Sequence, residues 1–118
     1  MRTVFTTTCS LVLLAAASAD EWRGTWTNKR TRSSGTLHCV TRPDGHGKWK
    51  ATFSGTFEGR PFKYRVTFRS AGSGDVVSGA AVISNRKYKW EGTLSPEKLT
   101  GRYKADNGYF GDFTLRKE

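Results

Sequence analysis

Two stretches in which apolar and polar residues alternate, 48–57 and 62–69, constrain the fold of this chain more than any other feature. Alternation with a period of two is the pattern of a β-strand that buries one face and exposes the other. Residues 58–61 between them have turn composition, so we predict a β-hairpin over residues 48–69. Its inward face carries the aromatic residues, and its outward face carries mostly cations.

Short segments of similar composition recur on both sides of this hairpin. No stretch of ten or more residues has apolar residues at helical spacing, so we predict no substantial helix. Eight sequential strands with short connections pair as neighbours, and they close most readily into a barrel without exposed edges. The predicted fold is therefore all-β, an eight-stranded antiparallel up-and-down meander that closes into a small barrel, with a two-sheet β-sandwich as the alternative. Besides the hairpin, the expected strands are 22–27, 36–42, 76–84, 87–94, 99–104 and 109–116, with an exposed turn at 28–35.

A glycine two residues before a large side chain recurs on five of the predicted strands. At inward positions such glycines let a strand bend sharply and leave room for an aromatic side chain of a neighbouring strand, as a small barrel requires. The pairs are Gly24 with Trp26, Gly55 with Phe57, Gly92 with Leu94, Gly101 with Tyr103 and Gly111 with Phe113.

The first 19 residues have the composition of a secretory signal peptide. Arg2 precedes an apolar run that is strongest at 11–16, and Ala-Ser-Ala follows at 17–19. We predict cleavage before Asp20, which leaves residues 20–118 as a single β-barrel domain that is secreted or periplasmic. The apolar run is shorter than the roughly 20 residues that a membrane-spanning helix needs, so we expect no membrane span.

The chain is strongly basic, with a formal net charge of +10. Loss of Arg2 would lower the Lys and Arg count from 20 to 19 against 10 Asp and Glu, and would leave a charge of +9. Such a charge either serves solubility alone, which its spread over nearly every predicted strand favours, or supports contact with polyanions, of which anionic polysaccharide is the candidate partner. Specific nucleic-acid binding is not expected, because the aromatic residues lie on the opposite strand face. The candidate polyanion-binding residues are Lys48, Lys50, Lys63, Arg65, Arg69, Lys87 and Lys89.

Few residues could carry catalysis or hold a metal ion. Beyond residue 19 the chain has one cysteine, Cys39, whose position in an alternating run predicts a buried and inert thiol without a disulfide in the domain. Cys39, Asp44 and His46 lack the regular spacing of a four-ligand metal site. No phosphate-binding loop or nucleophile motif is present. We therefore expect no enzymatic activity, no metal and no cofactor.

The motif Gly24-Thr25-Trp26, followed by a meander with short turns, resembles the start of the calycin-type barrels, the lipocalin and avidin-like proteins. Residues 99–103 and 111–115 resemble the C-terminal repeats of small exported bacterial proteins. The calycin resemblance implies an eight-stranded barrel that holds a small ligand inside.

These patterns together predict a non-enzymatic exported binding protein. We expect a small apolar ligand at the barrel mouth, lined by Trp49, Tyr64 and Trp90. Two alternatives remain open. One is a basic envelope or adhesion module that binds anionic polymers through its outer face, and the other is an inhibitor of a secreted enzyme that uses a loop such as 70–75.

Overall fold

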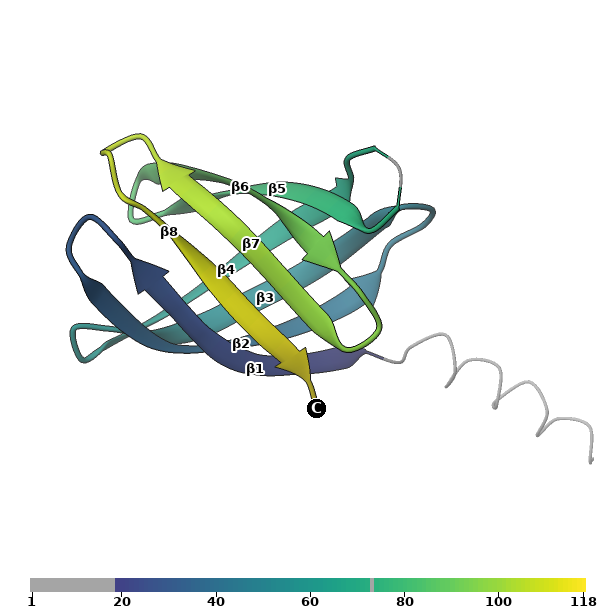
Figure 1. The fold of residues 1–118 in the computed structure, drawn as a ribbon, viewed down its shortest axis with the longest axis horizontal. Helices are drawn as coiled ribbons and strands as arrows, with labels where there is room; N and C mark the ends of the chain where they lie inside the picture. Colours follow the sequence, from purple (N-terminus) through teal and green to yellow (C-terminus); the bar gives the residue numbers. More distant parts are fainter. Residues whose placement is uncertain (1–18, 73) are drawn as a thin grey trace, which may run out of the picture.

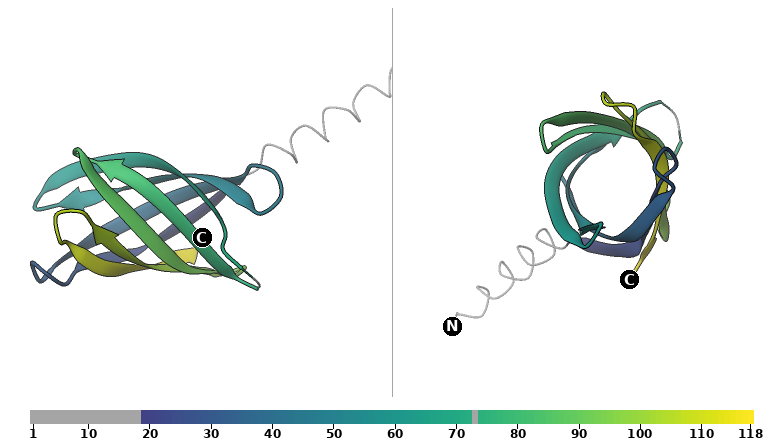
Figure 2. Two further views of the ribbon diagram at one scale, coloured as in Figure 1. Left: turned by 90° about the horizontal axis from the view of Figure 1, so that it is seen from above. Right: turned by 90° about the vertical axis from the view of Figure 1, so that its left-hand side faces the viewer.

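The computed structural model of the protein describes residues 19–72 and 74–118. In these residues eight antiparallel strands pair in chain order, and the last strand pairs with the first to close a barrel (Figures 1 and 2). The predicted meander is confirmed, and the sandwich alternative is excluded. The strands are β1 (Asp20–Asn28), β2 (Ser33–Pro43), β3 (Lys48–Phe57), β4 (Arg60–Ser70), β5 (Val76–Ile83), β6 (Arg86–Leu94), β7 (Lys98–Ala105) and β8 (Phe110–Lys117).

The predicted signal peptide lies outside the described residues, except for Ala19. Within the described ranges no helix is long and apolar enough to cross a membrane.

The predicted exposed turn at 28–35 is too long. Strand β1 continues to Asn28, and β2 already begins at Ser33, so the turn has only four residues. The reason lies in the Asn28 side chain, which is buried and whose Oδ1 accepts hydrogen bonds from the backbone N–H groups of Arg30 and Thr31. A side-chain oxygen that replaces backbone acceptors lets the chain reverse within a few residues.

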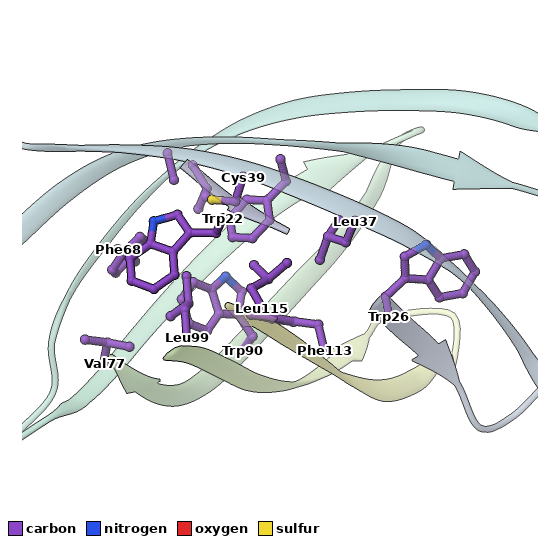
Figure 3. Packing of buried hydrophobic residues seen from close by; sticks show 13 residues of the cluster. Trp22, Trp26, Leu37, Cys39, Phe68, Val77, Trp90, Leu99, Phe113 and Leu115 are labelled. Carbon is purple, nitrogen blue, oxygen red and sulfur yellow. The ribbon is translucent and has the colours of Figure 1, made fainter. Parts of the chain in front are cut away.

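The ends of the barrel differ. The tight-turn end carries the turns at 29–32, 58–59, 84–85 and 106–109, whereas the terminal end carries the start of β1, the end of β8 and the other three connections (Figure 1). Most inward side chains toward the terminal end are almost completely buried, with Trp49 and Leu94 half-buried beside them, and we call the buried set the packed half. The packed half comprises Trp22, Cys39, Phe68, Val77, Leu99 and Leu115, each at most 2% exposed. Figure 3 shows this group together, with Trp26 set well apart from it.

Glycines make room for the large aromatic residues of the core. A Cβ added at Gly101 would lie 2.5 Å from the ring of Phe113 and 3.1 Å from that of Trp90. At Gly79, a position that the sequence did not single out, an added Cβ would lie 2.8 Å from the Trp90 indole nitrogen. The expected role of inward glycines is therefore confirmed at Gly101, since any side chain there would displace a core ring.

One seam in the barrel wall is only partly paired. Strand β4 has ten register partners on β3, from Arg60 to Arg69, but only three on β5, from Phe68 to Ser70. These three pairs lie at the terminal end, and from there β4 and β5 diverge toward the tight-turn end (Figure 1). Along this seam, residues 60–67 of β4 have no partner on β5, and residues 80–83 of β5 have no partner on β4.

Candidate functional site

Half-buried aromatic side chains line the barrel at its tight-turn end. They point inward, because they share the strand face of the packed half, but they retain contact with solvent. We call them the aromatic mouth: Phe57 from β3, Phe62 and Tyr64 from β4, Tyr88 from β6 and Tyr103 from β7.

The aromatic mouth is neutral and rich in hydroxyl groups. The rings of Tyr88 and Tyr103 have centroids 6.0 Å apart, and Tyr64 stacks on Phe62 at 6.1 Å. Burial is the main cause that raises the pKa of all three tyrosines, and it is reinforced by Cys39 at Tyr64, by Tyr109 at Tyr88 and by Tyr88 at Tyr103. The hydroxyls consequently stay protonated near neutral pH and can donate hydrogen bonds. The Tyr103 hydroxyl already donates to the Thr27 carbonyl oxygen at 2.5 Å.

Trp26 supplies a further donor beside the aromatic mouth. Its ring lies 5.5 Å from that of Phe57 and 6.4 Å from that of Phe62. Its indole N–H is buried and has no hydrogen-bond acceptor among the described residues, and the same is true of Trp90. A buried donor without an acceptor is costly, so a ligand with an acceptor atom would gain from meeting the Trp26 N–H.

The structure does not bring the three predicted ligand-binding residues to one mouth. Tyr64 belongs to the aromatic mouth. Trp90 is 5% exposed in the middle of the barrel, where it packs against Phe53 and Phe68. Trp49 is half-buried near the terminal end and stacks on Phe68 at 5.1 Å. Strand position explains this separation, because Trp49 follows the first residue of β3 at the terminal end, whereas Tyr64 lies mid-strand in β4, opposite Phe53 and closer to the tight-turn end.

The other residues of the aromatic mouth could have been found from the sequence. Each is an inward aromatic within a few residues of one of the four tight turns, whereas Trp49 follows the longer connection from β2 to β3. Alternation assigned the correct face to them, but alternation alone does not say which end of a strand stays open.

Five of the seven predicted polyanion-binding residues share one outward surface, which we call the basic face. Register places Lys48 opposite Arg69, and Arg65 and Lys63 lie farther along β4. Arg42 on β2, opposite Lys50, extends the basic face by one strand. Its members are Arg42, Lys48, Lys50, Lys63, Arg65 and Arg69.

The other two predicted cations lie elsewhere. Lys87 and Lys89 on β6 are separated from β4 by β5, and Lys89 lies opposite Lys104 of β7.

Acidic residues are absent from the outward positions of β3 and β4. The four ion pairs found among the described residues involve β1, β2, β8 and their flanking residues, and none includes a residue of the basic face. The cations of β3 and β4 are therefore not neutralised by neighbouring carboxylates.

A shallow groove on the outer wall adjoins the basic face. Its polar lining comprises Arg23, His38, Ser54 and Lys63, which lie side by side across β1 to β4 in one line of the register, together with Thr36 and Thr56. Apolar and small residues complete the lining, namely Gly24, Leu37, Gly55, Pro61 and Phe62. Since Lys63 belongs to both, the groove and the basic face are continuous.

One group of potential metal ligands lies on the outer wall. The ligand atoms of Glu21, His38 and Glu118 are within 4.8 Å of one another. The group already has internal partners, because Glu21 Oε1 lies 3.2 Å from the His38 Nε2 and Glu118 pairs with the Arg23 guanidinium. Sequence spacing could not reveal it, because Glu118 is remote in the chain. The three groups carry no observation that favours a bound ion over this ion-pair network.

Cys39 is fully buried, as predicted. Desolvation raises the pKa of its thiol to about 12, so it is not a nucleophile near neutral pH.

The predicted inhibitory loop is described only in part, because Ser73 lies outside the described residues. The Ala71 N–H donates to the Val76 carbonyl oxygen at 2.9 Å.

Comparison with known proteins defines the fold and no more. No family model matches the chain, and no curated protein matches it. Among solved structures, a redesigned β-barrel is similar with a TM-score of 0.72 and 19% identity, over 83% of this chain and 89% of the other. The redesigned barrel mFAP1, solved bound to DFHBI, has a TM-score of 0.65 and 18% identity, over 83% of this chain and 92% of the other. A de novo fluorescence-activating β-barrel is similar with a TM-score of 0.59 and 19% identity, over 86% of this chain and 92% of the other.

Proposed function

We propose that this chain is a non-enzymatic, exported, calycin-like binding protein that holds a small apolar ligand at the aromatic mouth. The observation that carries the proposal is the half-buried state of the inward aromatic residues at the tight-turn end, against the dry packed half. Aromatic walls with a few directed polar groups are the usual lining of small-molecule sites.

The structure supports a ligand with a flat apolar body and at least one acceptor atom. Tyr64 and Phe62 offer ring faces, and the Trp26 N–H offers a buried donor. Binding of DFHBI by mFAP1 supports the proposal, because a barrel of similar fold binds a small molecule. No charged side chain is among the residues of the aromatic mouth, so affinity should depend little on salt.

The test is a titration with the neutral dye Nile red, followed by dye emission and by quenching of tryptophan emission, at low and high salt. We expect saturable binding that salt does not weaken and that Tyr64→Ala reduces by about tenfold, which is the loss of one well-packed aromatic contact. Trp49→Phe is the matched control at the terminal end and should leave the affinity unchanged. Absence of saturable binding, or equal losses in both variants, would refute the aromatic mouth as the site.

A second candidate function rests on the basic face. Unneutralised cations on β2 to β4, joined to the outer groove at Lys63, favour an envelope or adhesion module that binds anionic polysaccharide. Retention on heparin should fall steeply as salt rises and should weaken in the double variant Lys50→Glu and Arg69→Glu. Lys104→Glu with Arg116→Glu makes the same charge change on β7 and β8. Equal weakening in both double variants would show that retention on heparin depends on net charge and not on the basic face.

A further inference from the structure

The unpaired edge of β4 is the most unusual feature of the barrel wall. Residues 60–67 pair with β3 on one side and have no register partner on β5. Alternate backbone N–H and C=O groups along such an edge lack strand partners, and a free edge of this length is a template for another extended chain.

The side chains beside this edge differ between its two faces. On the inward face Phe62 and Tyr64 are half-buried, and on the outward face Lys63 and Arg65 are exposed and belong to no ion pair among the described residues. A strand added to β4 would therefore place alternate side chains against aromatic rings and against cations.

These observations select one kind of partner. A second copy of the chain that paired through β4 would set Lys63 and Arg65 against the same cations, and like charges opposite one another destabilise a strand pair. We propose that β4 pairs at residues 60–67 with an extended segment of another protein, in which acidic and apolar residues alternate. The acidic side chains meet Lys63 and Arg65, and the apolar ones meet Phe62 and Tyr64.

This inference does not rest on the proposed ligand binding, although the partner strand would contact Phe62 and Tyr64 of the aromatic mouth and would compete with a ligand there. It differs from polysaccharide binding in one respect. Pairing of strands needs the backbone amides of the partner, whereas attraction to the basic face needs only negative charge.

The experiment measures fluorescence anisotropy with a labelled eight-residue peptide of alternating glutamate and valine. We expect binding that is at least about tenfold tighter than for a peptide of the same composition with its four glutamates contiguous, because only alternation fits both faces of the edge. N-methylation of alternate peptide amides should abolish the difference. Hydrogen exchange of β4 amides within 60–67 should slow when the peptide binds.

Protein variants complete the test. Lys63→Glu with Arg65→Glu should weaken peptide binding by at least about tenfold, whereas Lys104→Glu with Arg116→Glu, which carries the same charge change, should weaken it much less. Equal binding of the alternating, contiguous and N-methylated peptides would overturn the proposal and leave bare electrostatic attraction. So would binding without slower exchange on β4, or no binding at all.

Discussion

The two halves of the barrel interior are built from the same alternating strands and yet differ in their contact with solvent. On β4, Phe68 in the packed half is 0% exposed, whereas Phe62 in the aromatic mouth, on the same face, is half-buried. The wall accounts for part of the difference, because β4 and β5 are paired beside Phe68 and unpaired beside Phe62, but Val66 in the unpaired stretch is still only 6% exposed. Alternation thus decides which side chains point inward but not which of them become dry. Pairing of the wall does not decide it alone, since Tyr103 is paired on both sides and is still half-buried.

The largest effect should come from truncating these two phenylalanines. Phe68→Ala should lower the free energy of unfolding by about 3–5 kcal/mol, because it leaves a cavity among Trp49, Trp90 and the other packed rings. Phe62→Ala should cost only about 1–2 kcal/mol, since part of its surface already contacts water. Urea denaturation of both variants measures this contrast. Similar costs at the two positions would show that the halves are equally packed.

Alkaline pH tests how dry the packed half is. The thiol of Cys39 ionises from about pH 9 in the unfolded chain, whereas burial holds its pKa at about 12 in the fold. The contribution of the buried thiol to the free energy of unfolding is fully present below pH 9. It is lost as the pH rises from 9 to 12, because only the unfolded chain ionises there, and the loss reaches about 4 kcal/mol for a pKa difference of three.

Comparison with Cys39→Ala isolates this loss, because the lysines and the other tyrosines titrate alike in both proteins. Tyr64 is the exception, since Cys39 adds to the effect of burial on its pKa, but burial keeps its hydroxyl protonated in the fold over the range tested. Urea midpoints at pH 7, 9 and 10.5 should show wild type losing more stability than the variant above pH 9. Parallel pH profiles would mean that the thiol is not desolvated.

The sequence predicted most of the fold because the fold depends on a local pattern. Alternation in 48–69 identified the inward faces, and Cys39 was placed inside on the same basis. It could not show that β4 and β5 pair at only three positions, since nothing in either strand alone records how far two neighbours remain parallel. Alternation also does not record how far along the barrel a side chain lies, and for that reason Trp49 and Trp90 were grouped with Tyr64 although their strand positions separate them.

The distribution of charge on the outer wall shows the same limit of prediction from sequence. The cations of β3 and β4 follow directly from alternation, but their lack of acidic neighbours depends on the register of the three strands β2, β3 and β4. Lys87 has the same sequence signature as Lys63, and β5 separates it from the basic face.

The smallest effect lies within the aromatic mouth, between two of its tyrosines. The Tyr103 hydroxyl donates to the Thr27 carbonyl oxygen and so ties β7 to β1 past the intervening β8, whereas the Tyr64 hydroxyl has no hydrogen-bond partner among the described residues. Tyr103→Phe should therefore lower the free energy of unfolding by about 1 kcal/mol, the usual net value of one hydrogen bond, and Tyr64→Phe should change it by less. Thermal or urea denaturation resolves such a difference. If Tyr64→Phe proves the more costly, its hydroxyl has a structural partner, and the aromatic mouth is more completely packed than its half-buried rings indicate.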